Sequence, residues 1–432
     1  MRIIALLLLA VTTVVNAQPA KLVAKSEKLA KEVESKVIEW RHDIHQNPEL
    51  SNREFKTAEK IAAHLESLGI EVQTGVAHTG VVGVLKGGKP GPVVGLRADM
   101  DALPVTERVD IPWASKVKST YNNIETGVMH ACGHDTHVAM LMGAARILTE
   151  IKDELQGTIV FVFQPAEEGA PPGEEGGAKL MVKEGVLKNP DVDVIFGLHI
   201  SSNTPVGQIK YRPRGTMAAA DRFVIKVKGK QTHGSSPWSG VDPIVASAQI
   251  INGLQTIISR QSNLTEEAAV ITVGMMKAGT RNNIIPEEAE LIGTIRTLDT
   301  AMQSKIHRKI ELTATKIAES MGAKAEVDIQ IGTPVTFNDP ELTKKMIPTL
   351  HGVVGKENLM MVKPITGAED FAFYAREIPG LFLFVGGMPK DQDPSEAAPH
   401  HTPDFYIDES GMKLGVRTLC NLAIDYMAMN PK

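Results

Sequence analysis

Sulfur, imidazole and carboxylate groups occur close together in several short segments of this chain, and the first such segment is MHACGHDTH (129–137). Cys132 and His134 are two positions apart, so an extended or looped backbone points both side chains at one centre. The alternative is a redox or structural cysteine beside surface histidines. His137 opens the next predicted helix, where capping or packing is a simpler role than metal binding.

A pair of adjacent carboxylates, Glu167 and Glu168, follows the apolar run TIVFVF (158–163). Neighbouring side chains diverge at a strand end, so one carboxylate can bind a metal while the other serves as a general base. The alternative is a solvated acidic turn. The strongly apolar strand before the pair favours the catalytic interpretation.

Further candidates lie at the ends of two other apolar runs. His199 ends VIFGLHI (194–200), where a hydrogen-bonded core histidine is the plainer interpretation. Asp99 and Asp101, in RADMD (97–101), are either metal ligands or carboxylates that orient ligand imidazoles. Because open parallel sheets place their sites at the carboxyl ends of the strands, we expect all these segments to converge.

The elements that must position these residues alternate between apolar strands and amphipathic helices, which predicts a mostly parallel α/β sheet flanked by helices. From about residue 214 the order becomes strand, helix, two strands, helix, strand, with half-solvated strands such as RFVIKVKGK (222–230). This order predicts a ferredoxin-like α+β domain inserted at 214–333. The catalytic domain is then discontinuous, over 18–213 and 334–432.

Composition excludes some classes of function. With 46 basic and 51 acidic residues and no basic stripe, nucleic acid is not expected as a partner. The N-terminal residues 1–17 are interpreted as a signal peptide, because their apolar region is shorter than the roughly 20 residues of a membrane-spanning helix. The alternative is an uncleaved membrane anchor. We therefore expect a secreted or periplasmic protein without a membrane segment in its mature form. The two cysteines, Cys132 and Cys420, are expected to stay unpaired.

The polar segments also occur in a recognisable order. They resemble the hippurate hydrolase and indole-3-acetyl-amino-acid hydrolase branch of the dinuclear aminoacylase/carboxypeptidase family, from about Trp40 to the C-terminal helix. The segments that carry the resemblance are GLRADMDALPV, MHACGHDTH, QPAEEG, GLHI, HGSSP, NNIIPEEAELIGTIR, GAEDFAFY and HTPDF. The sequence departs from the family pattern at APPGEE (170–175), a segment that is expected to form a mobile loop at the mouth of the cleft.

The resemblance implies a dinuclear metal site. Its expected ligands are Cys132, His134, Glu168, His199 and His401. Glu167 matches the general base, and Asp101 matches a carboxylate that orients a ligand. Two divalent ions are implied, zinc or manganese, and the ligand types also permit cobalt or nickel.

Residues of the inserted domain are implied as well. His233 matches a histidine that reaches a neighbouring subunit's active site and stabilises an oxyanion, so a homodimer is expected. Asn283 matches a residue that holds the polar end of the substrate. Arg296 is a candidate for gripping a carboxylate, with a solvent-facing role as its alternative.

The implied activity is hydrolysis of the amide bond of a small N-acyl amino acid, giving a carboxylic acid and a free amino acid. A metallo-dipeptidase or aminopeptidase is one rival, but it needs an acidic anchor for a free ammonium group, and the sequence offers no clear candidate. A non-catalytic periplasmic metal- or ligand-binding protein is another, and the presence of Glu167 argues against it.

Overall fold

The computed structural model describes residues 2–431, and their side chains from residue 19 onward. The expected signal peptide over residues 1–17 lies outside the described side chains. Within the part of the chain that is described, no helix combines the length and the apolar character needed to cross a bilayer.

The chain divides into two compact units. The first unit comprises Met1–Arg214, Asn338–Val362 and Phe373–Lys432, and the second comprises Gly215–Phe337 and Lys363–Ala372. The short piece Lys363–Ala372 belongs to the second unit because its backbone bonds there. The Ile365 amide donates to the Thr216 carbonyl, and the Ala218 amide donates to the Gly367 carbonyl.

The large sheet of the first unit is parallel at its centre. Its order is β1-β2-β6-β3-β7-β18-β8-β17, and β6, β3, β7 and β18 run parallel to one another. The central strands are apolar runs buried on both faces, as parallel strands require. The strands are β1 Glu71–Val76, β2 Gly80–Lys86, β3 Lys89–Asp99, β6 Gln156–Gln164, β7 Val194–Pro205, β8 Ile209–Tyr211, β17 Leu359–Met361 and β18 Gly380–Met388.

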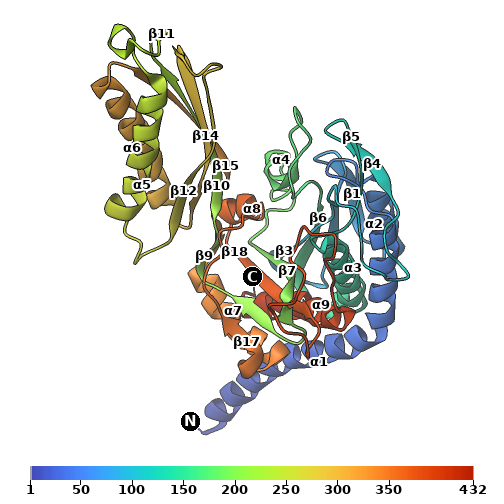
Figure 1. The fold of residues 1–432 in the computed structure, drawn as a ribbon. Coiled ribbons are helices and arrows are strands. Elements are labelled where there is room, and N and C mark those ends of the chain that lie inside the picture. Colours follow the sequence, from blue (N-terminus) through green and yellow to red (C-terminus); the bar gives the residue numbers. More distant parts are fainter. Residues whose placement is uncertain (1, 432) are drawn as a thin grey trace. The chain divides into compact units, whose positions relative to one another are not determined.

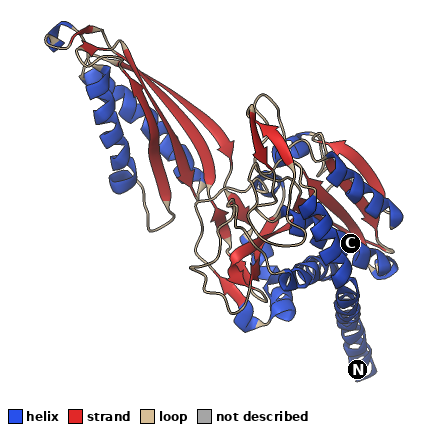
Figure 2. Cartoon of the chain, turned by 45° about the vertical axis from the view of Figure 1, so that its right-hand side comes forward, coloured by secondary structure: helices blue, strands red, loops and turns tan. Residues whose placement is uncertain are grey.

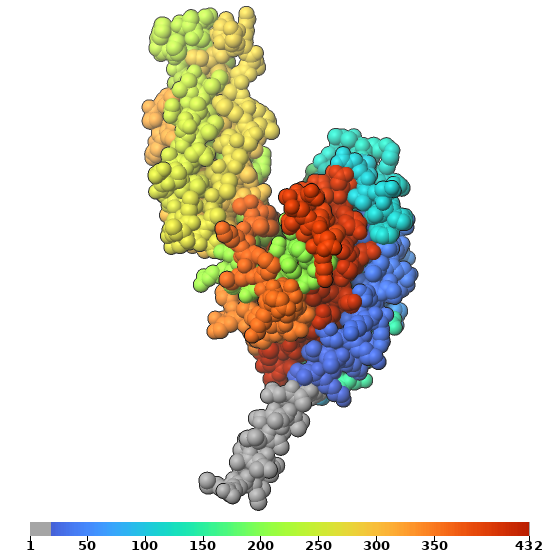
Figure 3. Space-filling view, turned by 60° about the horizontal axis from the view of Figure 1, so that its bottom comes forward, coloured from blue at the N-terminus to red at the C-terminus, as the bar shows by residue number. Residues whose placement is uncertain are grey.

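Helices cover this sheet, which confirms the predicted layered α/β architecture (Figure 1). The long helix α1 packs against α3 and α9, and both of these pack on β3. Segments from the two ends of the chain are therefore neighbours on the surface of this unit (Figure 3). The helices are α1 Arg2–Gln46, α2 Phe55–Ser67, α3 His134–Glu150, α4 Gly177–Lys183, α7 Pro340–Val354, α8 Ala372–Glu377 and α9 Met412–Met429, with 3-10 turns η1 Lys152–Glu154, η3 Lys356–Asn358 and η4 Glu409–Gly411.

The second unit is ferredoxin-like, as the element order predicts. Its antiparallel sheet has the order β12-β14-β10-β15, and its two helices pack together on one face (Figure 2). Side chains of β10 alternate between buried and more exposed, so the opposite face of the sheet is open. The elements are β10 Ala219–Lys228, α5 Pro243–Gln261, β12 Ala269–Ala278, β14 Glu288–Thr297, α6 Thr300–Ser320 and β15 Lys324–Thr333.

Short ladders complete the structure. The β4–β5 hairpin belongs to the first unit, while β11 pairs with β13 in the second. The remaining elements are β4 Lys118–Tyr121, β5 Ile124–Gly127, β9 Arg214–Met217, β11 Thr232–His233, η2 Pro237–Ser239, β13 Ile284–Ile285 and β16 Thr336–Asn338.

Candidate metal centre

The carboxyl ends of three adjacent parallel strands meet at one edge of the large sheet, as expected. Asp99 ends β3, and the Glu167–Glu168 pair follows the last residue of β6. His199 lies on β7, but β7 continues to Pro205 instead of ending near the histidine. The three segments nevertheless face one another, because β6, β3 and β7 are neighbours in the sheet.

The cysteine segment approaches this edge through a turn that ends in helix α3. Gly133 has φ +92°, and a Cβ there would lie 2.4 Å from the Ile200 side chain, so only glycine fits. His134 is the first residue of α3, and Cys132 lies just before the turn. The tight turn therefore places both side chains at the helix start, beside β7.

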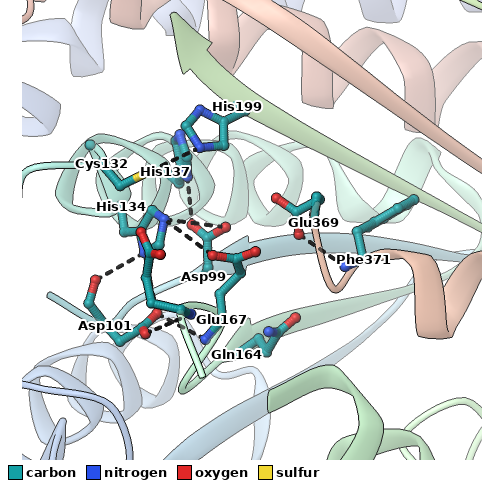
Figure 4. Close-up of polar contacts among 12 residues, drawn as sticks. Asp99, Asp101, Cys132, His134, His137, Gln164, Glu167, His199, Glu369 and Phe371 are labelled. Atoms are coloured by element: carbon teal, nitrogen blue, oxygen red, sulfur yellow. Dashed lines mark hydrogen bonds and ion pairs between the residues drawn. The ribbon is translucent and has the colours of Figure 1, made fainter. Parts of the chain in front are cut away.

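The five expected metal ligands come together in the first unit. The Cys132 Sγ lies 3.2 Å from the His401 Nε2 and 3.4 Å from the His199 Nε2. The same His401 nitrogen is 2.9 Å from a carboxylate oxygen of Glu168. The potential donor atoms of His134, Glu167 and Glu168 all lie within 4.8 Å of one another. The side chains of Cys132, His134, Glu167 and His199 point toward a common region (Figure 4).

His401 reaches this cluster from a distant loop. Its backbone N–H donates to the Ala131 carbonyl at 2.8 Å, next to Cys132. Its φ is +64°, a left-handed conformation that is costly for a residue with a Cβ. A strained backbone held by a specific hydrogen bond is a common feature of functional sites.

Hydrogen bonds hold the Nδ1 atoms of His134 and His199 and leave their Nε2 atoms directed at the cluster. The His134 Nδ1 contacts the Asp101 carbonyl at 2.9 Å and its carboxylate at 3.2 Å. The His134 Nε2 is buried and has no hydrogen-bond partner among the described residues. The His199 Nδ1 donates to the Ile200 carbonyl, and its Nε2 faces Cys132. Outer partners that fix the ring in this way are typical of metal-binding histidines.

Two further histidines lie beside the cluster but have both ring nitrogens engaged. The His137 Nδ1 donates to Asp99 at 2.5 Å, and its Nε2 accepts the Ile200 N–H. The His400 Nε2 accepts the Ser202 N–H, and its Nδ1 donates to the Cys132 carbonyl. These rings therefore support the site without a nitrogen left for a metal, which agrees with the packing role expected for His137.

The donor set fits divalent cations. Burial, followed by the charges of Glu168 and Glu167, raises the pKa of the Cys132 thiol well above its ordinary value. A bound cation reverses this effect, since it stabilises the thiolate and offsets the neighbouring carboxylates. One thiolate, three imidazoles and a carboxylate are ligands for zinc and similar transition metals. The buried His134 Nε2, which has no hydrogen-bond partner among the described residues, supports the same conclusion.

Asp101 holds several parts of this site together. One of its oxygens accepts the Glu167 N–H at 3.1 Å and faces the His134 ring, and the other accepts the Glu168 N–H at 3.1 Å. The Ser51 hydroxyl also donates to it, at 2.7 Å. Asp101, expected to orient a ligand, thus contacts both the His134 ring and two amides of the acidic turn. Ser51 was missed by the sequence reasoning, because no local pattern links it to a strand end.

The insertion at 170–175 is anchored at its acidic end. Glu174 forms an ion pair with Arg53 at 2.5 Å and accepts a hydrogen bond from Asn52. Glu175 forms a further ion pair with Lys183 at 2.6 Å. These contacts link the acidic end of the segment to the residues before α2 and to α4.

Within the second unit, the structure brings His233 and Asn283 together. They lie on the paired strand β11 and directly before β13, and the Gly234 N–H donates to the Asn283 carbonyl at 2.8 Å. The His233 side chain is exposed, and its Nδ1 accepts hydrogen bonds from the N–H and the hydroxyl of Ser235. The neutral ring therefore carries its proton on Nε2, which is available as a donor.

Arg296 lies in the same unit but far from His233 and Asn283. It lies opposite Ala220 and Val270 near the carboxyl end of β14, whereas Asn283 precedes the other end of that strand. At about 3.3 Å per residue, β14 separates the two by more than roughly 25 Å. The structure therefore does not bring Arg296 to the His233–Asn283 pair.

The model of peptidase family M20/M25/M40 matches residues 95–425. This chain belongs to that family. A protein of Saccharolobus solfataricus named thermostable carboxypeptidase 2 is 42% identical over 407 residues, which cover 94% of this chain and 99% of the relative. A protein of Arabidopsis thaliana named IAA-amino acid hydrolase ILR1-like 4 is 39% identical over 391 residues, covering 90% and 84% respectively.

A solved structure of an M20-family protein agrees with this assignment. The YXEP protein of Bacillus subtilis, described as a dinuclear metal-binding peptidase of the M20 family, is 35% identical and superimposes with a TM-score of 0.76. The match covers 92% of this chain and 99% of that protein. The chain is thus an M20-family metal-dependent hydrolase, as the resemblance of its sequence segments implies.

Proposed function

We propose that this M20 hydrolase cleaves the amide bond of N-acyl amino acids and releases a carboxylic acid and a free amino acid. The observation that carries the proposal is the position of two adjacent carboxylates of one acidic turn beside the histidines of the cluster. The Glu168 carboxylate lies 2.9 Å from the His401 Nε2, and the Glu167 carboxylate lies 3.9 Å from the unbonded His134 Nε2. These contacts support the proposal that Glu168 is a ligand and that Glu167 is the base.

Two divalent ions, zinc or manganese, bound by Cys132, His134, Glu168, His199 and His401 would supply a Lewis acid and lower the pKa of water at the site. Glu167 takes a proton from the attacking water. It then delivers that proton to the nitrogen of the departing amino acid. A single carboxylate can perform both steps because it is protonated by the first one.

The second unit is proposed to complete the site in a homodimer. The His233 Nε2–H of one copy would donate a hydrogen bond to the oxyanion formed on the substrate in the other copy. Asn283, beside it, would hold the polar end of the substrate. On this proposal the first unit is the catalytic domain and the second unit is the domain for dimerisation.

The proposed location is the periplasm or the exterior of the cell. It rests on the N-terminal sequence, in which Arg2 precedes an apolar region and a site of small residues at 15–17. Mass spectrometry of the exported protein should show a mature chain that begins near Gln18. Retention of residues 1–17 in the exported protein would contradict this part of the proposal.

Peptide hydrolysis is the second candidate, because the relative from Saccharolobus solfataricus bears the name carboxypeptidase. The two activities differ in the acyl group on the carbonyl side of the scissile bond, which carries a free α-amino group in a dipeptide. The test is release of free amine by metal-loaded protein from N-benzoyl, N-indoleacetyl and N-acetyl amino acids, compared with dipeptides that have a free amino group. Preference for the acylated substrates supports the proposal, and cleavage of the free dipeptides alone would overturn it.

A further inference from the structure

A second buried carboxylate, that of Glu54, reaches the acidic turn from the start of α2. One of its oxygens accepts the Ala166 N–H at 2.9 Å, and the other contacts the Thr79 hydroxyl at 2.6 Å. The side chain is fully buried. It thus touches the residue directly before the Glu167–Glu168 pair, although it lies more than a hundred positions away in sequence.

The usual explanation for an acidic residue at a helix start is a helix cap, and Glu54 does not serve as one. Its side chain makes no capping hydrogen bond to α2. Glu49 makes those bonds instead, because its carboxylate accepts the N–H groups of Lys56 and Thr57 at 3.2 Å and 2.9 Å. The position of Glu54 therefore requires another explanation.

The residue that donates to Glu54, Ala166, has a strained backbone conformation. Ala166 has φ +51°, in the left-handed region that residues with a Cβ rarely adopt. Three consecutive amides of the turn donate hydrogen bonds to two buried carboxylates. The Ala166 N–H donates to Glu54, and the next two N–H groups donate to Asp101. The directions of the Glu167 and Glu168 side chains depend on this backbone conformation.

We propose that Glu54 is a positioning residue of the reaction, which holds the Ala166 amide and thereby aims Glu167 and Glu168. The inference rests on the proposed roles of those two residues as base and ligand. A strained conformation persists only where its surroundings over-determine it. Glu54 accepts the hydrogen bond from the Ala166 N–H, whereas Asp101 accepts those of the next two amides.

A neutral side chain at position 54 can also accept the hydrogen bond from the Ala166 N–H. Burial, followed by the charge of Asp101, raises the pKa of Glu54 to about 8. Glu54→Gln keeps an oxygen for the Ala166 N–H, and its amide group can donate to the Thr79 hydroxyl, which is able to accept. Glu54→Met fills a similar volume but offers no acceptor. Glu54→Asp keeps the carboxylate but is one methylene shorter.

The experiment measures zinc affinity, by competition with a chelator, together with kcat and KM for an N-acyl amino acid. Loss of an outer partner typically weakens metal affinity about 10- to 100-fold. We expect that loss for Glu54→Met, with kcat lowered about 10- to 100-fold and KM changed far less. Glu54→Asp should change both in the same direction, and Glu54→Gln should stay within about threefold of the wild type.

Glu49→Ala is the matched control, since it removes a carboxylate from the same helix start without touching the turn. It should lower the melting temperature by roughly 1–3 °C, the size expected for a lost cap in a unit of this length, and leave zinc affinity and kcat unchanged. Equal losses in Glu49→Ala and Glu54→Met would reduce Glu54 to a support of α2 and overturn the inference. Unchanged zinc affinity in both Glu54→Met and Glu54→Asp would do the same. Failure of the wild type to hydrolyse any acylated substrate would refute the proposed function, while the zinc titration would still decide the role of Glu54.

Discussion

Replacing Asp101 with asparagine removes one hydrogen-bond acceptor from the centre of the site. One carboxylate oxygen accepts the Glu167 N–H and faces the His134 ring, and the other accepts the Glu168 N–H and the Ser51 hydroxyl. The NH2 group of the asparagine will occupy the position of the second oxygen. The Ser51 hydroxyl can rotate there and accept a hydrogen bond from it, whereas the His134 ring N–H beside the first oxygen cannot accept one. Only the Glu168 N–H is then left without an acceptor.

The magnitude follows from that single loss. A buried N–H without a partner costs about 1–3 kcal/mol. Because 1.4 kcal/mol corresponds to a tenfold change in an equilibrium constant, a cost expressed fully in metal binding weakens affinity by about 5- to 150-fold. Glu168 is the expected ligand next to that amide, so most of the cost should appear in metal binding.

The assay is a zinc titration of Asp101→Asn in competition with a chelator, with Ser51→Ala as the control. Ser51→Ala removes one of the accepted bonds and leaves both turn amides paired, so its zinc affinity should fall less than about fivefold. A zinc affinity of Asp101→Asn within twofold of the wild type would refute the view that Asp101 aims the ligands through the turn.

The other predictions test separate parts of the structure. Cys132→Ser should lower zinc occupancy measured by elemental analysis, because a hydroxyl is a far poorer ligand than a thiolate; full occupancy with unaltered kinetics would make Cys132 a packed thiol. Both cysteines are free, so thiol titration of the denatured, unreduced protein should find two thiols per chain, and a count of zero would contradict this. Hydrogen bonds from His307, Gln303 and Gly332 outweigh burial and hold the pKa of Asp221 below its ordinary value. Asp221→Asn should therefore destabilise the metal-free protein by about 2 kcal/mol at pH 7 in urea unfolding, and the difference should shrink as pH falls below about 4; a difference that does not change with pH would rule out the carboxylate as its cause. His233→Ala should lower kcat by roughly 10²–10³, and mixing it with Glu167→Ala should restore activity if His233 acts across a dimer interface, whereas no recovery after verified subunit exchange would exclude that.

Much of the site could be predicted because it lies on strand ends. Asp101, Glu167 and Glu168 follow apolar runs, and a parallel sheet gathers such positions at one edge. The resemblance to known segments then added His401, which lies in a loop that no periodicity could place. The ferredoxin-like unit was also predictable, since the alternating pattern of its strands and the order of its elements are local properties of the sequence.

The remaining features depend on contacts between distant segments. Glu49 and Glu54 are both acidic residues near the start of α2, and only the three-dimensional structure shows that one caps the helix while the other reaches the turn after β6. Arg296 resembled a substrate anchor by its place in a motif, yet β14 carries it away from Asn283. The sequence could not show the continuation of β7 beyond His199, because it is set by pairing with β18.

The most direct test of the two-metal hydrolase is a comparison of wild type with Glu167→Gln, in which metal content and release of free amine from an N-acyl amino acid are measured on the same samples. Glu167 is proposed to touch water and not metal. The variant should therefore keep both ions while its turnover falls by at least about 10², the lower end of the contribution of general-base catalysis. Turnover equal to that of the wild type, or metal content that falls in step with activity, would contradict the assignment of Glu167 as the base.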